Sequence, residues 1–317
     1  MRIFASIKSL VKVETTKINT AINPIFEPFW FNSQEYADHQ SDILNYTFLH
    51  HEATKQVFIR LYRKGEDLIS PWRAPFGGPE LSSEVTIQYL FDFIKEILEQ
   101  VKSKGIKKIS IVAPPECYDI AKADLLDEVL LHAGFSVSVT ELNYHLDTDM
   151  GDFEKFVHDS EKRKLNKCFQ AGFEFSIEKN PDYKKIHQLI SDCRSRKGHP
   201  LSMNLEDFEK MFRDFPQQYI PFVVKDKEVT IAAAVGVKVR SDILYNFLPA
   251  DHPDYLSYSP MVLLNKGMYD YCRQNSFRLY DLGIATSGGI RNEGLIKFKE
   301  HIGGKLSHKY SYEINIR

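Results

Sequence analysis

The sequence has few cysteines, no long apolar run and almost no net charge. The four cysteines form no C-x-x-C pair and have no histidine at ligand spacing: Cys117, Cys168, Cys193 and Cys272. This argues against a disulfide framework or a zinc site. No segment approaches the roughly 20 apolar residues of a membrane span. Residues 1–13, which are broken by two lysines, lack the apolar core of a secretory signal. We therefore expect a cytoplasmic protein with no metal and no membrane span.

Several function classes are also disfavoured. The chain carries 41 Lys+Arg against 43 Asp+Glu, so the net charge of −2 gives no electrostatic reason to expect DNA binding. It has no G-x-x-x-x-G-K-[ST], G-x-G-x-x-G, G-x-S-x-G or H-E-x-x-H motif. Nucleotide hydrolysis, Rossmann oxidoreduction and zinc proteolysis are therefore not indicated.

The length of 317 residues exceeds the size at which one hydrophobic core usually splits, about 250–300 residues. We expect two domains, at 1–150 and 151–317. Each half shows the same order: strand, irregular loop, long helix, short strand, second helix, glycine and final strand. Gly134 and Gly303 take matching places, although the halves share almost no residue identity. The pattern predicts an α/β protein made of two mixed sheets flanked by helices.

Periodicity predicts individual elements in both halves. The clearest helix carries an apolar stripe over residues 87–101, with Ser82 or Ser83 as its cap. Other predicted helices are 121–133, 152–171, 182–196, 204–213, 260–274 and 292–302. The predicted strands are 57–62, 109–113, 135–142, 173–177, 219–224, 228–239, 243–248, 277–282 and 306–316.

A first candidate site is the strand end, loop and helix start over residues 246–261. A helix N-terminus presents unpaired N–H groups to an anion, and Pro260 fits the first turn. The alternative is an ordinary loop with a serine cap. If the loop holds a donor molecule, the expected contacts come from Leu248, Ser257, Ser259 and Met261.

A second candidate is the Gly-rich loop and helix over residues 281–299. Lys297 and Lys299 are two residues apart on the helix and cannot share one face. If one is solvated, the other points inward, where a lysine needs an anionic partner. The alternative is that Lys299 reaches the surface along an apolar wall. The residues of this region expected to contact substrate are Arg291, Asn292, Glu293 and Lys297.

Two further regions carry cations. The loop over residues 72–78 places Arg73 between Trp72 and Phe76, which suits an anionic or flat ligand. It also suits a loop that only packs its aromatic side chains. The run of four cations in residues 161–167 is either a solvated helix face or a phosphate or nucleic-acid contact.

These residues resemble a known family. The stretch 280–283, followed by 294–299 and Gly303-Gly304, is similar to the closing motif of tandem GNAT proteins. These include the Fem-type transferases, which attach amino acids to peptidoglycan precursors in bacteria. Residues 161–173 look like that family's basic helix leading into a strand. The resemblance covers most of residues 45–317.

The resemblance implies two tandem acyl-CoA N-acyltransferase-like units, each with a splayed mixed sheet, the first degenerate. It implies transfer of an acyl or aminoacyl group from acyl-CoA or aminoacyl-tRNA, as co-substrate, to an amine or cell-wall precursor. No cofactor would be bound permanently. Lys299 matches an active-site lysine that would stabilise negative charge or hold an anionic group. Asp281 or Glu293 would act as base and Tyr258 as acid.

One departure leaves alternatives open. GNAT enzymes usually carry a Q/R-x-x-G-x-G/A donor loop, whereas residues 249–259 contain no glycine. The basic helix at 161–167 favours an aminoacyl-tRNA-dependent cell-wall-precursor transferase as one alternative. The glycine-free loop favours a non-catalytic binding module as another.

Overall fold

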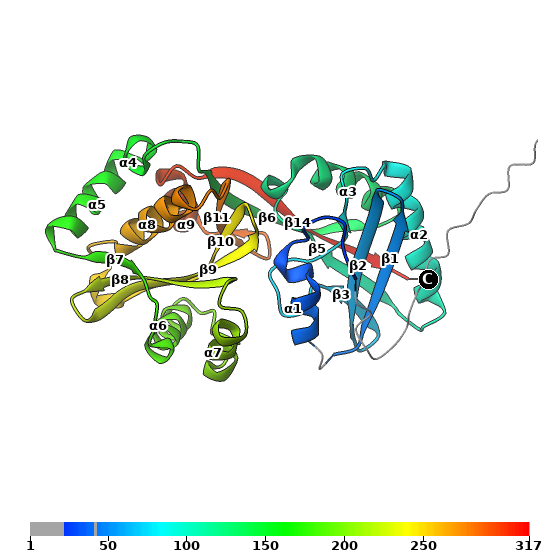
Figure 1. Ribbon diagram of the computed structural model, residues 1–317, viewed down its shortest axis with the longest axis horizontal. Coiled ribbons are helices and arrows are strands. Elements are labelled where there is room, and N and C mark those ends of the chain that lie inside the picture. Colours follow the sequence, from blue (N-terminus) through cyan, green and yellow to red (C-terminus); the bar gives the residue numbers. More distant parts are fainter. Residues whose placement is uncertain (1–21, 41–42, 317) are drawn as a thin grey trace, which may run out of the picture. The chain divides into compact units, whose positions relative to one another are not determined.

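The computed structural model describes residues 22–40 and 43–316, so the segment 1–13 discussed above lies outside the described residues. The chain divides into two compact units (Figure 1). Unit 1 comprises residues 1–141 and 308–317, and unit 2 comprises residues 142–307.

Unit 1 contains strands in the order β1-β2-β3-β5-β14, with β4 paired to β2. Its central strands β3 and β5 are parallel and the other pairs are antiparallel. Helices α2 and α3 bury apolar side chains in this unit's core. The elements are η1 (Trp30–Asn32), α1 (Gln34–His39), β1 (Asn45–Glu52), β2 (Lys55–Lys64), β3 (Asp67–Ser70), β4 (Glu80–Leu81), α2 (Ile87–Lys102), β5 (Lys108–Val112), η2 (Glu116–Tyr118), α3 (Ile120–His132), β6 (Ser136–Asp147) and β14 (Lys305–Asn315).

Unit 2 contains strands in the order β6-β11-β10-β9-β8-β7, of which only β10 and β11 are parallel. Helices α8 and α9 lie on one side of these strands, and α6 and α7 on the other (Figure 1). Its elements are α4 (Phe153–Phe156), α5 (Asp159–Gln170), β7 (Glu174–Ile177), α6 (Tyr183–Arg196), α7 (Leu205–Asp214), β8 (Tyr219–Asp226), β9 (Val229–Arg240), β10 (Ile243–Asp251), η3 (Pro253–Tyr255), α8 (Pro260–Gln274), β11 (Leu279–Ile284), β12 (Thr286–Ser287), β13 (Ile290–Arg291) and α9 (Glu293–His301).

The last strand of each half pairs in the unit formed by the other half. Strand β6, which follows α3, pairs with β11 through residues 143–147 in unit 2. Strand β14, at the end of the chain, pairs with β5 through residues 311–315 in unit 1. The units therefore differ from the expected division at residue 150. The exchange brings residues 142–150 into unit 2 and residues 308–317 into unit 1.

Local sequence signals explain most helix boundaries. Two of the predicted helices nevertheless differ from the structure. Helix α2 is capped by Thr86, whose hydroxyl accepts from Tyr89 N, and not by the expected Ser82 or Ser83. Ser82 instead pairs with the β2 backbone through Gln56. The basic segment expected as one helix over 152–171 divides into α4 and α5, because the chain is extended at Val157. Strands β1 and β3 were not predicted.

Helix α8 packs so closely on β7 that one position has no room for a side chain. A Cβ at Gly267 would lie 2.3 Å from ring atoms of Phe175. We expect Gly267→Ala to lower the free energy of unfolding by about 1–3 kcal/mol through overpacking, less the roughly 1 kcal/mol that alanine gains in a helix. Chemical denaturation measures this. The matched control is Gly294→Ala in α9, where a Cβ meets only ordinary contact. A Gly267→Ala protein as stable as the wild type would contradict the packing argument.

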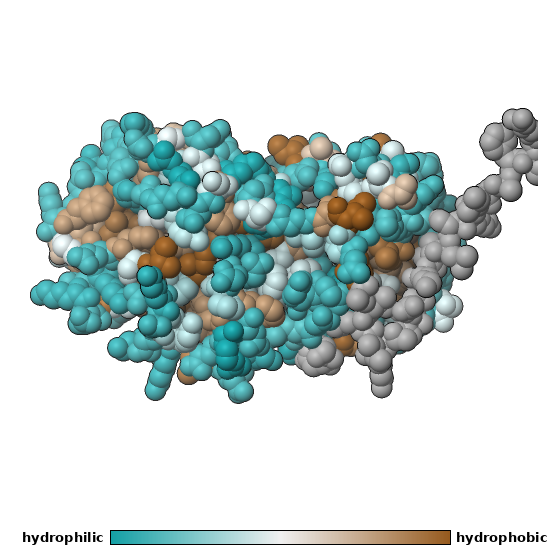
Figure 2. Space-filling view, viewed as in Figure 1, coloured by the Kyte–Doolittle hydropathy of each residue, from teal (hydrophilic) through white to brown (hydrophobic). Residues whose placement is uncertain are grey.

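The surface drawn in Figure 2 is mostly polar, with apolar side chains exposed in separate patches. Scattered apolar side chains of this kind are normal on the surface of a folded protein. Within residues 22–40 and 43–316, no helix combines the length and apolar character that crossing a bilayer requires.

Candidate functional site

The parallel strands of unit 2 run together for only a short distance. Strands β10 and β11 pair at Ile243–Tyr245 with Leu279–Asp281. Beyond this, β10 continues to Asp251 beside β9, and β11 continues to Ile284 beside β6. The two strands therefore part at their C-terminal ends. Backbone groups that face a parting of this kind are free to bind a ligand in place of a neighbouring strand.

Both strands are distorted where they part. In β10 the register with β9 jumps between Phe247 and Ala250, and Leu248 takes a left-handed φ of 54°. In β11 the register with β6 shifts between Asp281 and Gly283. Gly283 has a φ of 76°, and a Cβ there would lie 3.3 Å from the Tyr245 ring. Bulges of this kind bend a strand away from its neighbour.

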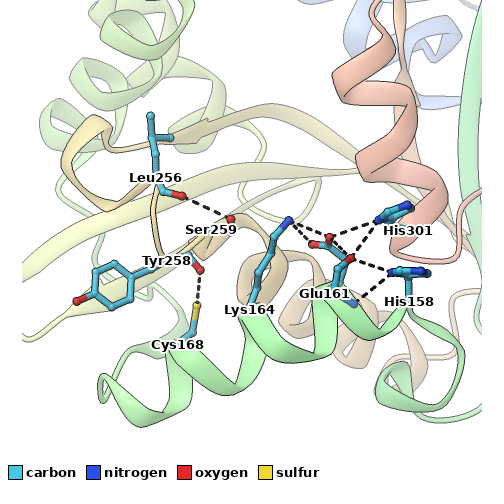
Figure 3. A network of polar contacts seen from close by, with 9 residues as sticks. His158, Glu161, Lys164, Cys168, Leu256, Tyr258, Ser259 and His301 are labelled. Carbon is cyan, nitrogen blue, oxygen red and sulfur yellow. Dashed lines mark hydrogen bonds and ion pairs between the residues drawn. The ribbon is translucent and has the colours of Figure 1, made fainter.

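Helix α8 begins at the end of the loop that follows β10. Its N-cap residue, Ser259, has a left-handed φ of 56° and makes no side-chain cap. The Ser259 hydroxyl instead donates to Leu256 O, at 3.5 Å (Figure 3). Pro260 has no N–H group, and Val262 N donates to Ser259 O at 3.0 Å. The start of α8 therefore offers an anionic group the Met261 N–H and the positive end of the helix dipole.

Helix α5 holds this loop in place. Lys167 Nζ donates to Ser257 O at 2.9 Å and lies 4.4 Å from the centroid of the Tyr258 ring. Cys168 Sγ donates to Tyr258 O at 3.4 Å (Figure 3). The Tyr258 ring also packs edge-on against Phe173. Helix α5 therefore positions Ser257 and Tyr258, while donor binding by Leu248, Ser257, Ser259 and Met261 stays a prediction.

A buried polar network fixes the start of α8 against both parting strands. Tyr280 Oη donates to Asn265 Oδ1 at 2.8 Å, and Asn246 Nδ2 donates to Tyr280 Oη at 2.9 Å. Asn265 Nδ2 donates to Met261 O at 2.7 Å. Within the described residues, Asn246 Oδ1 is buried without a partner. The first candidate region began at Asn246, but the sequence analysis assigned no role to Asn246 or Asn265. An asparagine inside an apolar strand was the available signal.

Lys299 lies inside unit 2, so the alternative that it reaches the surface is wrong. Its side chain is only 5% exposed, whereas Lys297 is on the surface. Lys299 Nζ donates to Gly283 O at 2.7 Å and to Ile284 O at 2.8 Å, at the end of β11. Burial lowers the pKa of Lys299 to about 7, and the Asp281 carboxylate opposes this shift. An ammonium group has three N–H donors, so one remains for a ligand.

Asp281 is the buried acidic group of the site. It is 1% exposed and accepts from Asn143 Nδ2 at 2.9 Å and from Gly283 N at 2.8 Å. The second bond closes the bulge in β11. Asp281 therefore supports the bulge that aims the Gly283 carbonyl at Lys299, in addition to the role of base that we predicted for it.

The other predicted residues of the second candidate region are exposed. Arg291 Nε donates to Glu293 Oε1 at 2.7 Å. Asn292 Oδ1 accepts from Leu295 N at 3.0 Å and so caps α9. These contacts account for three of the residues as local structure, and their role in substrate binding stays a prediction.

The aromatic loop belongs to unit 1. The Arg73 side chain is exposed and stacks on Trp72, with Cζ 5.5 Å from the ring centroid. Phe76 is buried against Phe29 and Phe31. The packing role considered for this loop therefore applies to Phe76, whereas Arg73 is open to solvent.

Unit 1 has no equivalent parting of its parallel strands. Strands β3 and β5 pair to the end of β3 at Ser70. The chain then returns, so that Gly77 N donates to Val112 O at 2.8 Å and Gly78 N to Ser70 Oγ at 2.9 Å. A Cβ at Gly77 would lie 2.7 Å from Ser70 Oγ. The loop after β3 thus fills the place that is open in unit 2.

A second polar cluster joins α5 to α9 (Figure 3). Glu161 is 2% exposed and accepts from Lys164 Nζ at 2.9 Å and from Ser160 Oγ at 3.0 Å. His301 Nδ1 lies 3.6 Å from Glu161 Oε1, and the rings of His158 and His301 stack at 4.3 Å. Helix α5 therefore contacts both the helix that carries Lys299 and the loop before α8.

Most of unit 2 matches a known protein family. Residues 157–294 match the family model described as an acetyltransferase (GNAT) domain. No curated protein sequence matches the chain. Among the described residues, no cluster of three or more His, Cys, Asp and Glu side chains is placed to hold a metal ion.

Solved structures share the fold along nearly the whole chain. A crystal structure of FemX is similar with a TM-score of 0.67 at 13% identity, covering 90% of this chain and 92% of that one. L-PGS from Bacillus licheniformis has a TM-score of 0.55 at 16% identity, covering 84% and 83%. A tandem GNAT protein from the clavulanic acid biosynthesis pathway has a TM-score of 0.52 at 10% identity, covering 87% and 84%. The chain therefore has the tandem GNAT fold, as the sequence predicted.

Proposed function

We propose that this chain, a tandem GNAT fold whose second unit contains a GNAT domain, is an N-acyltransferase with its site in unit 2. It transfers an acyl group from an acyl-CoA thioester to an amine. The observation that carries the proposal is the parting of β10 and β11 beside the uncapped start of α8 and the buried Lys299. Unit 1 lacks such an opening and is proposed to be degenerate.

The donor fits the parted strands by its chemistry. Coenzyme A carries a pyrophosphate, which suits the Met261 N–H and the positive end of the helix dipole at the start of α8, with Ser257 and Ser259 beside them. Its amide-containing arm needs hydrogen-bond partners along the strands. Asn246 Oδ1, which is buried without a partner, is suited to accept from an amide N–H there. The glycine-free loop at 249–259 is compatible with this site because Ser259 itself takes the left-handed conformation.

The transfer step needs charge stabilisation and proton removal. The acceptor nitrogen attacks the thioester carbonyl, the oxygen becomes negative, and the bond to sulfur then breaks. Lys299 is held by two carbonyl groups and offers its remaining N–H to the negative oxygen. The attacking amine loses a proton, for which Asp281 is the proposed base. Tyr258 is the proposed acid for the leaving thiolate.

Donor binding tests the proposal directly. A ligand that binds only the folded state stabilises it by mass action, by about 2.7 kcal/mol at a hundredfold excess over its Kd. We expect acetyl-CoA to raise the melting temperature. Dephospho- and desulfo-analogues of coenzyme A should raise it by no more than acetyl-CoA does. Met261→Asp places a carboxylate at the start of α8 and should abolish the shift. An unchanged melting temperature with acetyl-CoA, propionyl-CoA and succinyl-CoA would contradict the acyl-CoA proposal and favour a binding module.

The pH dependence tests the state of Lys299. Its pKa of about 7 means that the charged form disappears as pH rises through neutrality. If the ammonium stabilises the negative oxygen, the rate at saturating substrates falls above pH 7, approaching about tenfold per pH unit. Lys299→Arg keeps the charge at all these values and should remove this fall. A rate that rises through pH 7 instead would make the neutral amine the active form and Lys299 the proton acceptor.

A second candidate is aminoacyl transfer from a tRNA ester to a small amine or cell-wall precursor. The observation that favours it is the exposed cationic face of α5, on which Arg163 lies one turn from Lys167, and Lys167 Nζ donates to Ser257 O in the loop before α8. Binding of tRNA through these residues should weaken steeply with salt. A tRNA titration that responds weakly to salt, or is unchanged in Arg163→Glu, would discard this candidate. Four free, buried thiols suit the reducing cytoplasm that we propose as the location.

A further inference from the structure

A row of polar side chains crosses the strands of unit 2 just before they part. Tyr245 on β10 pairs with Asp281 on β11, and Asp281 pairs with His145 on β6. Residues paired across neighbouring strands point to the same face of a sheet. The row lies on the face opposite to α8, because the adjacent positions Leu244, Tyr280 and Leu146 belong to the core under α8.

Arg194 of α6 lies at the same face of the sheet. Helix α6 ends beside the C-terminal end of β10, since Cys193 Sγ and Arg196 Nη2 contact Asp251 Oδ1 at 3.3 and 2.9 Å. Helix α6 packs against β10, the strand that carries Tyr245. Burial raises the pKa of the Tyr245 phenol, Asp281 adds to this shift, and the Arg194 guanidinium opposes it.

Arg194 has no protein partner for its charge. The Arg194 side chain is half-buried, its Nε is buried without a hydrogen bond, and no carboxylate among the described residues pairs with it. By contrast, its neighbour Arg196 forms an ion pair with Asp251. A guanidinium is charged at every accessible pH, so a buried donor left unpaired is costly unless an anionic group binds there.

His145, at the other end of the row, has an unpaired nitrogen as well. The side chain is 9% exposed, and Nδ1 is buried with no partner within the described part of the chain. Burial lowers the pKa of His145, although Asp147 and Asp281 oppose the shift. The ring is therefore neutral at pH 7, and one nitrogen can accept a hydrogen bond from an amine.

We propose that this row binds the acceptor, and that the acceptor is a primary amine bearing its own anionic group, a carboxylate or a phosphate. The anionic group pairs with Arg194. The amine lies toward His145 and Asp281, where Nδ1 of His145 accepts its hydrogen bond. This inference rests on the proposed function, since it names the substrate class of that same site. Neither Arg194 nor His145 was a candidate in the sequence analysis.

Three amines of similar length test the proposal. β-Alanine carries a carboxylate, O-phosphoethanolamine carries a phosphate, and ethanolamine carries neither. With acetyl-CoA as donor, we expect kcat/KM for at least one anionic amine to exceed that of ethanolamine by about tenfold or more, because a hydrogen bond to a charged group is strong. Arg194→Gln should reduce this ratio to about one. Whichever of β-alanine and O-phosphoethanolamine gives the larger kcat/KM relative to ethanolamine shows whether the site prefers a carboxylate or a phosphate.

The matched control is Arg213→Gln, which removes an exposed arginine of α7 and should leave the ratio unchanged. Melting temperature provides a second measurement that needs no turnover. The preferred anionic amine should raise it in the wild type and not in Arg194→Gln. This shift without any acetyl transfer would support the acceptor site while contradicting acyl-CoA as the donor. Equal kcat/KM for all three amines, a preference retained in Arg194→Gln, or no shift and no transfer with any amine would overturn the inference.

Discussion

Replacing Lys299 by Met should lower the transfer rate by about 10²–10³-fold, the usual effect of removing one donor to a developing negative charge. The side chain is buried, and its Nζ bridges Gly283 O and Ile284 O at the end of β11. The substitution therefore removes the charge and also leaves two carbonyl groups without a partner. The measurement is single-turnover acetyl transfer at saturating donor, which separates chemistry from binding.

The control for this prediction must separate catalysis from folding. Lys185→Met removes an exposed lysine of α6 that pairs only with Asp182 and should leave the rate unchanged. The melting temperature of Lys299→Met shows how much stability the protein loses when the two carbonyl groups lose their hydrogen-bond donor. Lys299→Arg keeps a charged donor and should retain more activity than the methionine variant. A folded Lys299→Met protein with wild-type turnover would remove Lys299 from the mechanism.

Deleting residues 308–317 should unfold unit 1, although these residues lie far from the rest of it in sequence. They form most of β14, which pairs with β5 and buries Tyr312, whose hydroxyl donates to Asp127 Oδ1 at 2.9 Å. Loss of one large buried aromatic costs about 3–5 kcal/mol. The unpaired edge of β5 adds to this, and a domain has only about 5–15 kcal/mol of stability in total.

Hydrogen exchange measures the outcome unit by unit. We expect α2 and β5 to lose their slow-exchanging amides in the truncated protein. Tyr312→Ala should reproduce much of the effect, whereas Tyr312→Phe removes only the hydrogen bond and should cost about 1 kcal/mol. A chain ending at residue 150 should fail to fold for the same reason, because β14 is missing. Full protection of unit 1 after truncation would show that β14 is dispensable there.

The sequence predicted the elements more successfully than their partners. The apolar stripe of α2 and the proline at the start of α8 fixed those helices through local rules that need no tertiary information. The sequence analysis missed β1 and β3, where neither alternation nor turn residues stood out. It also ended β10 at Leu248, because the proline that follows suggested a loop. The strand instead passes through a bulge, which no local rule placed there.

The candidate site divides in the same way. Two lysines at i and i+2 on a helix must face different directions, so the sequence indicated one inward lysine, and the family resemblance identified it as Lys299. Arg194 and His145 could not be found. Each is ordinary in its own segment, and only the register of three strands and the position of α6 make their nitrogens unpaired.

By itself, the sequence determined the alternation of helices and strands in each half, and that Lys297 and Lys299 face different directions. These follow from residue spacing along one segment, where neighbours are set by helix and strand geometry. The likeness to tandem GNAT proteins came from motif resemblance, which also singled out Lys299 as the inward lysine. Only the tertiary structure decided which unit each final strand joins, where β10 and β11 part, and which cations lack a partner. These depend on pairing between segments that are far apart in the chain. The residue pattern of one strand shows which of its faces is buried but does not identify the strand with which it pairs.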